Sequence, residues 1–299
     1  MTTCFSAWIY WNPDRDIFTI PFINHPLRWY GLLFALGFIV GYAIFYRLIL
    51  RKLNQNDIPN AKKVAISLTD SLTWFVVAGT IIGARLGHVF FYEWPKYRQD
   101  PLSIFKIWEG GLASHGGVIG ILLALYFYKK IILKNFKNIS YLDILDMLCI
   151  PSAFTAFCIR IGNFFNQEIL GSETSLPWGI IFGDPADHSA LVPRHPVQLY
   201  EAFSGLFTFF ILLYIWKKNA HLRTGIISGL FFILIFGSRF LIEFLKLPSS
   251  LMIDESWLQT GQLLSLPCIA AGFLLTTGSH LWLHAIAASR LKKLFSKQQ

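Results

Sequence analysis

The sequence predicts an all-α, polytopic membrane protein with about seven transmembrane helices, an interfacial amphipathic arm and a small outer domain. Composition is the first observation: 54% of the 299 residues are hydrophobic and only 14% are charged, which is too apolar for an ordinary soluble domain. The second is that apolar runs of about 20 residues, the length that crosses a bilayer core, recur along the chain. The third is that Lys and Arg gather at the ends of these runs, as anchors beside anionic lipid do.

Seven apolar runs are long enough to cross the membrane. They span residues 29–50, 72–92, 116–133, 145–165, 197–216, 225–245 and 261–285. We therefore treat residues 1–299 as a single integral membrane domain. Residues 1–26 lack the basic start, continuous apolar core and small-residue cleavage site of a signal peptide, so the first run is expected to be retained.

The distribution of Lys and Arg predicts the orientation of the chain. Most of these residues lie after the last run or in the loops that follow the first, third and fifth runs. Cytoplasmic loops carry the excess of Lys and Arg, so these segments are expected in the cytoplasm. The N-terminus is then outside and the C-terminus is cytoplasmic, as an odd number of spans requires.

Two segments on the outer side are longer than turns. In residues 93–115, Trp94, Tyr97, Phe105 and other apolar residues alternate with charged ones, which predicts an amphipathic segment in the membrane interface that acts as a lid or arm. Residues 171–196 are rich in Gly, Pro, Asp and His. They are expected to form a small outer domain inserted between spans four and five.

A polar stretch ends the fourth run. Residues 160–171 read Arg-Ile-Gly-Asn-Phe-Phe-Asn-Gln-Glu-Ile-Leu-Gly. Ionisable groups are costly at membrane depth and usually mark a functional site. If the helix continues, Arg160, Asn163 and Gln167 share one face and offer donors that suit a phosphate. The alternative is that Arg160 pairs with Glu168 or a backbone carbonyl and closes the bundle.

Two more arginines lie within the apolar runs. Arg239 and Glu243 stand at i, i+4 in the sixth run, where the alternative is an internal ion pair that is costly in lipid. Arg85 and His88 stand at i, i+3 in the second run, where snorkelling or pairing is the alternative. Three guanidiniums in one bundle with few buried acids require an anion, and phospholipid phosphate is the most abundant anion in a membrane.

Several outer-end residues are candidates for proton transfer or support. His115 lies between glycine pairs at the start of the third run. Its near-neutral pKa makes it the candidate base, although a lone His is more often structural. Tyr30 begins the first run, where an aromatic-belt anchor is the alternative. Residues 195–201 open the fifth run, and their polar groups either support a site or only begin the helix.

Several function classes are disfavoured by what the sequence lacks. The formal charge of +9 does not indicate nucleic-acid binding, because no nucleic-acid-binding motif is found. A transporter is expected to show paired repeats and broken helices, which we do not find. A lipid hydrolase needs a water-activating metal or a nucleophile motif, and neither Gly-x-Ser-x-Gly nor a ligand cluster is recognisable. Four scattered cysteines indicate no disulfide framework and no zinc site.

Taken together, these residues resemble the bacterial prolipoprotein diacylglyceryl transferase family. The resemblance covers nearly the whole chain, and its most specific part is the pattern Arg-x-Gly-Asn-Phe-x-Asn-x-Glu-x-x-Gly that begins at Arg160. Ile159 stands where the family usually has Gly. The other matching segments are residues 28–31, 84–87, 114–117, 194–196, 239–243 and 261–262.

The resemblance implies transfer of the diacylglyceryl group of phosphatidylglycerol to the thiol of the lipobox cysteine of preprolipoproteins, in the bacterial cytoplasmic (inner) membrane. The transfer forms a thioether and releases glycerol 1-phosphate, as the first step of lipoprotein maturation. No cofactor and no metal are implied; the partners are phosphatidylglycerol, lipobox signal peptides and membrane lipids. The implied catalytic residues are His115, Arg239, Arg160 and Tyr30. The implied substrate-binding residues are Arg160, Asn163, Asn166, Glu168, Gly171, Arg85 and Glu243.

Overall fold

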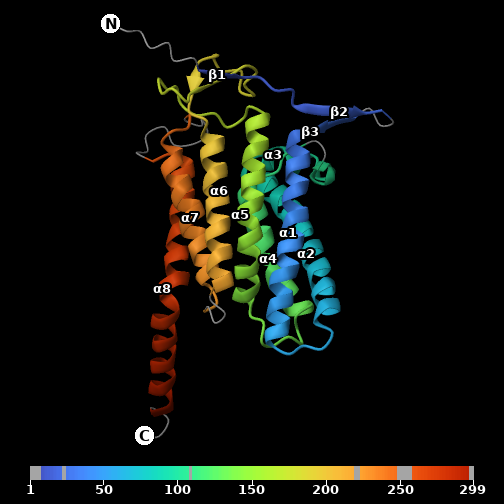
Figure 1. Ribbon diagram of the computed structural model, residues 1–299. Coiled ribbons are helices and arrows are strands. Elements are labelled where there is room, and N and C mark those ends of the chain that lie inside the picture. The colour runs from blue at the N-terminus through green and yellow to red at the C-terminus, as the bar shows by residue number, and fades with distance from the viewer. Residues whose placement is uncertain (1–7, 22–24, 108–109, 219–222, 248–257, 296–299) are drawn as a thin grey trace. The chain divides into compact units, whose positions relative to one another are not determined.

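The computed structural model describes residues 8–21, 25–107, 110–218, 223–247 and 258–295, and most of them are helical (Figure 1). The chain forms two compact units, residues 1–41 with 148–299 and residues 42–147. The helices are α1 (Trp29–Gln55), α2 (Ala61–Phe91), α3 (Trp94–Gln99), the 3-10 helix η1 (Pro101–Phe105), α4 (Ser114–Ile131), α5 (Tyr141–Phe165), α6 (Val197–Lys218), α7 (Ile226–Glu243) and α8 (Thr260–Phe295).

The seven apolar runs coincide with seven of these helices, so the prediction of an all-α polytopic membrane protein is confirmed. Six of the described helices are long and apolar enough to cross a membrane: α1, α2, α5, α6, α7 and residues 260–277 of α8. The third run corresponds to α4, which has 18 residues and is not among these six. Among the described residues, six helices therefore meet this criterion, one fewer than the seven expected.

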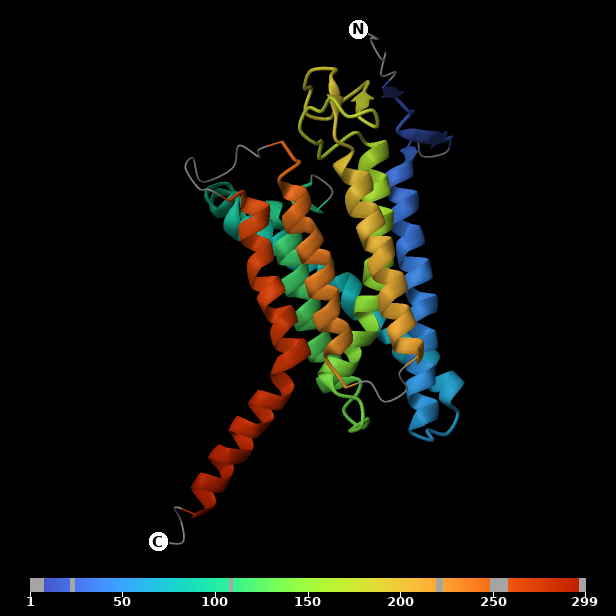
Figure 2. The same ribbon diagram turned by 60° about the vertical axis from the view of Figure 1, so that its left-hand side comes forward.

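In the first unit, α7 packs against both α6 and α8. Figure 2 shows α7 and α8 side by side, and the C-terminal part of α8 extends beyond the other helices of its unit. The close approach of α7 and α8 depends on Gly229, because a Cβ added there would lie 2.8 Å from the Gly272 carbonyl oxygen. Small residues at such crossings let the backbones of membrane helices touch.

The second unit is built on the pair α2 and α4. Glycines recur every four residues on the facing sides, at Gly79, Gly83 and Gly87 of α2 and at Gly116 and Gly120 of α4. A Cβ added at Gly120 would collide with the backbone carbonyl of Gly79. The two backbones are therefore in direct contact, which is the geometry that small residues at four-residue spacing permit.

The segment predicted to form the outer domain belongs to a β-sheet that the sequence analysis missed. A three-stranded sheet has the order β1 (Ile9–Trp11), β4 (Ile180–Phe182) and β5 (Pro193–Arg194), with β1 parallel to β4 and β5 antiparallel to it. Residues 171–196 thus contribute β4 and β5 to a sheet that also includes the N-terminal strand β1. A three-residue strand whose partner lies about 170 positions away leaves no periodic signal in the sequence. Strands β2 (Asp16–Ile20) and β3 (His25–Arg28) form an antiparallel hairpin.

A small hydrophobic core holds the outer sheet on the end of α5. Phe164, Leu170, Ile180 and Phe182 are buried together, and Trp11 packs against them. The Trp11 ring stacks on Phe164 with centroids 4.5 Å apart, and its Nε1 donates to the Phe164 carbonyl at 3.1 Å. The end of α5, where the polar stretch begins, is thereby fixed against the outer domain.

The predicted interfacial segment, residues 93–115, is formed by α3, η1 and a glycine loop. Its Tyr97 is buried, whereas Leu102 and Phe105 are 73% and 74% exposed. Exposed apolar side chains on a short outer segment suit the boundary between lipid and water. Its position in the membrane interface stays a prediction.

Candidate active site

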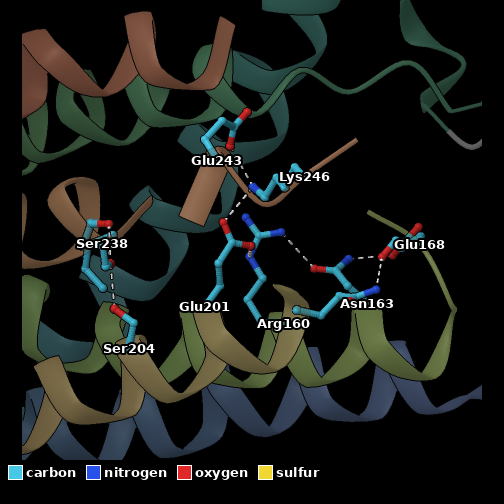
Figure 3. Close-up of polar contacts among 10 residues, drawn as sticks. Arg160, Asn163, Glu168, Glu201, Ser204, Ser238, Glu243 and Lys246 are labelled. Atoms are coloured by element: carbon cyan, nitrogen blue, oxygen red, sulfur yellow. Dashed lines mark hydrogen bonds and ion pairs between the residues drawn. The ribbon is translucent and has the colours of Figure 1, made fainter. Parts of the chain in front are cut away.

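The first unit contains a chain of buried charges that joins three helices (Figure 3). Arg160 lies in the last turns of α5, Glu201 in the first turns of α6, and Glu243 ends α7. Arg160 Nε lies 2.9 Å from Glu201 Oε2. Lys246 Nζ lies 2.8 Å from Glu201 Oε1 and 2.9 Å from Glu243 Oε2. The carboxylate of Glu201 is therefore shared between two cations.

Arg160 is also linked to Glu168, but through an amide rather than directly. Arg160 Nη1 donates to Asn163 Oδ1 at 3.3 Å, and Asn163 Nδ2 donates to Glu168 Oε1 at 2.6 Å. Asn166 Nδ2 donates to the same oxygen at 3.3 Å. Gln198 Nε2 donates to the Glu168 backbone carbonyl at 2.8 Å. A direct pair of Arg160 with Glu168, the alternative in the sequence analysis, is thus not formed, and Arg160 pairs with Glu201 instead.

The expectation that Gln167 shares a face with Arg160 is wrong, because α5 ends first. Gln167 adopts a positive φ of 53°, and the amides of Gln167 and Glu168 donate to the carbonyls of Phe164 and Asn163, which is the Schellman pattern of a helix end. Gln167 is fully buried and turns to the outer domain. Its Nε2 donates to Asn12 Oδ1 at 3.1 Å.

Arg239 lies one turn before Glu243 on α7, and among the described residues it has no ion pair or hydrogen bond. It is partly buried and close enough to Arg160 for the two charges to repel each other. Next to it, Ser204 Oγ of α6 donates to Ser238 Oγ at 2.6 Å (Figure 3), which ties this part of α7 to α6. The internal pair of Arg239 with Glu243, the alternative reading of the sequence, is not formed, because Glu243 is bound to Lys246.

Tyr30 packs beside the same cluster. A Cβ added at Gly162 would lie 2.8 Å from the Tyr30 ring, so the glycine of the Arg160 segment provides the space for this side chain. Tyr30 interacts electrostatically with Glu168 and with Arg160. The structure thus brings Tyr30, Arg160, Asn163 and Glu168 together, and their role in a site stays a prediction.

Gly171 contributes through its backbone. It forms an isolated antiparallel bridge with Lys246, and a Cβ at Gly171 would collide with the His195 carbonyl. Ser172 N donates to the Leu245 carbonyl at 2.8 Å. The chain after α7 is therefore held against residues 171–172, which gives Gly171 a packing role beside its predicted substrate-binding role.

Arg85 lies in the second unit and uses its guanidinium differently from what the sequence suggested. All its nitrogens donate to backbone carbonyls, and its side chain also lies over the Tyr97 ring at 5.1 Å. The acceptors are Ser103, Ile104, Lys106, Gly110 and Gly111. These carbonyls occupy the donors that a lipid phosphate would need. The contacts favour a role for Arg85 in fixing the segment after α3 to α2.

We therefore predict that Arg85→Gln loosens residues 101–107 and 110–111. A glutamine cannot reach five carbonyls, so amide hydrogen exchange in this segment should rise by at least tenfold as local opening becomes easier. Hydrogen exchange followed by mass spectrometry measures this. Arg98→Gln, at an exposed position in α3, is the matched control and should leave the exchange unchanged. If amide exchange in Arg85→Gln is as slow as in the parent, Arg85 does not fix this segment, and its predicted substrate-binding role is favoured instead.

His115 also lies in the second unit, in the first turn of α4. Its ring contacts Phe91 and Tyr92 of the α2 end, with centroids 5.4 Å and 5.7 Å apart. His88, one turn earlier on α2, lies 3.5 Å from Glu93 through Nε2. The base role of His115 stays a prediction. Among the described residues, no three His, Cys, Asp or Glu side chains gather as ligands for a metal.

Two residues of the cluster were missed by sequence reasoning. Glu201 belongs to the polar opening of the fifth run, where the sequence analysis left its role open, and Lys246, just after the sixth run, was given no role. Both are buried, with 9% and 8% of their surface exposed. A carboxylate within an apolar run requires a cation nearby. This rule predicts a cationic partner for Glu201, and the structure has two, Arg160 and Lys246.

The sequence of this chain is similar to those of one protein family. The model of the family described as prolipoprotein diacylglyceryl transferase matches residues 16–277. Three relatives carry the name phosphatidylglycerol–prolipoprotein diacylglyceryl transferase. The one from Protochlamydia amoebophila is 40% identical and aligns over 97% of this chain and all of its own. Those from Porphyromonas gingivalis and Tolumonas auensis are 42% and 39% identical over 90% and 89% of this chain, and 94% and 96% of theirs.

Proposed function

Because the chain belongs to the prolipoprotein diacylglyceryl transferase family, we propose that it transfers the diacylglyceryl group of phosphatidylglycerol to the thiol of the lipobox cysteine of a preprolipoprotein. The products are a thioether-linked lipoprotein precursor and glycerol 1-phosphate. The chain is a transferase of lipoprotein biosynthesis and a multi-pass membrane protein. Its substrates are a membrane lipid and a membrane-bound peptide, which suits a site within an apolar bundle.

One observation carries the assignment of the phosphate site. Arg239 has no ion pair among the described residues, whereas the neighbouring cations Arg160 and Lys246 are bound to Glu201. Arg160 Nη2 makes no hydrogen bond among the described residues, whereas Nε lies on Glu201 and Nη1 donates to Asn163. A partly buried guanidinium without a counter-ion is a strong binding site for phosphate, since it can donate two parallel hydrogen bonds.

The reaction is a substitution at an sp³ carbon. The thiolate sulfur of the peptide attacks the glyceryl carbon that carries the phosphate ester, the carbon–oxygen bond breaks, and the electron pair leaves with glycerol 1-phosphate. Arg239 and Arg160 hold the phosphate and stabilise the charge that grows on the leaving oxygen. Asn163, Glu168 and Glu243 position these arginines or their partners.

The thiol must lose its proton before or during the attack. His115 is the proposed base, because an imidazole side chain can accept a proton from a thiol and release it again. Tyr30 is proposed to act beside the phosphate site, since it packs on Gly162 next to Arg160. The substrate-binding roles of Asn166 and Gly171 follow from their places in the same segment.

The proposed activity is tested with purified protein, phosphatidylglycerol in mixed micelles and a synthetic lipobox peptide. Mass spectrometry of the peptide should show the added diacylglyceryl group, and glycerol 1-phosphate should appear in equal amount. A peptide with serine in place of the lipobox cysteine is the control and should stay unmodified. Release of glycerol 1-phosphate without peptide modification would instead indicate a hydrolase.

We further propose that the protein lies in the bacterial cytoplasmic membrane with the outer domain outside and the C-terminus in the cytoplasm. In a cysteine-free background, Ala190→Cys in the outer domain should react with an impermeant maleimide in intact cells. Asn135→Cys, between α4 and α5, should react only after lysis. Both positions are exposed. The reverse labelling pattern would overturn this orientation.

A further inference from the structure

Lys246 is a buried cation to which the sequence analysis gave no role in the site. It follows α7, its side chain is 8% exposed, and its ammonium lies within 2.9 Å of both Glu201 and Glu243. Figure 3 shows it between these two carboxylates, which come from different helices. A buried ammonium with two carboxylate partners is compensated, so it needs no further anion of its own.

Glu243 has a second cation within reach. Arg239 stands four residues earlier on the same helix, and side chains at that spacing are neighbours on a helix surface. An arginine and a glutamate at this spacing are close enough to form an ion pair. In the structure, the Glu243 carboxylate lies instead on Lys246, three residues later. Among the described residues, Arg239 lacks a carboxylate partner only as long as Glu243 stays bound to Lys246.

Two further features fix the carboxylate away from Arg239. The Glu243 carboxylate lies against Gly261, where an added Cβ would collide with it. Gly261 is in the first turn of α8, and the partial positive charge at a helix N-terminus stabilises a carboxylate. Glu243 is thus seated between the ammonium of Lys246 and the start of α8.

The place of Lys246 is itself set by the backbone. It pairs with Gly171 in an isolated bridge, flanked by the hydrogen bonds from Ser172 N to the Leu245 carbonyl and from Leu247 N to the Leu170 carbonyl. The segment that carries Lys246 is therefore attached to the end of the Arg160 stretch. This bridge fixes the backbone position from which the ammonium reaches Glu243 and Glu201.

We propose that Lys246 is a positioning residue that captures Glu243 and thereby keeps Arg239 available for the phosphate of the lipid substrate. The inference rests on the proposed function, and it gives Lys246 no contact with substrate. Without the ammonium, Glu243 turns to Arg239 and competes with the phosphate. Phosphatidylglycerol then binds more weakly, because the Glu243 carboxylate occupies the guanidinium of Arg239.

The test is a double-mutant cycle. Lys246→Met keeps most of the side-chain volume and removes the charge. It should raise the KM for phosphatidylglycerol by at least tenfold in the parent background. In the Glu243→Gln background, where the Glu243 carboxylate can no longer compete for Arg239, the same change should alter KM by less than threefold. Lys246→Arg, which retains a cation, should stay within threefold of the parent.

An equal rise of KM in both backgrounds would overturn the inference, because Lys246 would then act through Glu201 and Arg160 or through folding. Thermal unfolding in detergent is measured on every variant. If Lys246→Met does not fold, Gly261→Ala, which displaces the Glu243 carboxylate and leaves Lys246 in place, is measured in the same two backgrounds. A KM effect confined to the parent background supports the inference, and an equal effect or none overturns it.

The Arg239→Gln variant separates this inference from the proposed function. If Arg239→Gln transfers diacylglyceryl at the parental rate, the phosphate assignment itself fails. If Arg239→Gln is inactive while the cycle shows no coupling between Lys246 and Glu243, only the role of Lys246 fails.

Discussion

Replacing Arg239 with lysine is expected to lower kcat/KM for diacylglyceryl transfer at least tenfold, which corresponds to about 1.4 kcal/mol of transition-state stabilisation. The charge is retained, but an ammonium cannot reproduce the planar, two-pronged contact of a guanidinium with phosphate. Arg239→Ala removes the charge as well. Its loss is expected to reach about 10²–10³-fold, the range for a donor that stabilises charge developing in the transition state.

The control for Arg239 is the neighbouring serine. Ser238→Ala removes the hydrogen bond to Ser204 that ties α7 to α6, so it tests whether disturbed packing alone reduces transfer. We expect a loss below threefold in this variant. Parental activity in Arg239→Lys, measured by thioether formation, would reassign Arg239 to a structural role.

The second large effect is expected for Arg160→Ala. This change removes the ion pair with Glu201 and the link through Asn163 to Glu168, and transfer should fall by at least 100-fold. Stability should fall less than the about 3–5 kcal/mol that an orphaned buried charge costs, because Lys246 still neutralises Glu201. Folding is therefore expected to survive while catalysis fails.

Thermal unfolding and thioether formation are measured on the same Arg160→Ala preparation. Lys218→Gln, at an exposed position at the end of α6, accompanies it as a control for the loss of a positive charge. An Arg160→Ala protein that unfolds early in detergent yet retains most of its transfer activity would assign Arg160 to the scaffold alone.

The helices of this protein could be predicted from the sequence because each is determined locally. A run of about 20 apolar residues must satisfy its backbone hydrogen bonds within itself, so it forms a helix wherever it occurs. The outer sheet could not be predicted, since β1 and β4 pair across about 170 residues. The fourth run ends at residue 165, as α5 does, but the turn that takes Gln167 away from Arg160 was not predicted, since its partner Asn12 lies far away in the sequence.

The candidate site was predictable in its members more than in its pairings. Polar groups within apolar runs can be recognised from the sequence alone. This applies to the segment from Arg160 to Gly171 and to Arg239 and Glu243. Which acid pairs with which cation depends on how helices pack. Lys246 follows α7 directly, yet its partner Glu201 lies on α6, 45 residues away.

The central claim, that Arg239 is the available cation that binds the lipid phosphate, is tested most directly by lipid-dependent thermal unfolding. At a lipid concentration of 100 times Kd, binding should stabilise the parent by about 2.7 kcal/mol through mass action. The account predicts that phosphatidylglycerol stabilises Arg239→Gln much less than the parent, whereas diacylglycerol, which lacks the phosphate, affects both equally. Equal stabilisation of parent and Arg239→Gln by phosphatidylglycerol would contradict it.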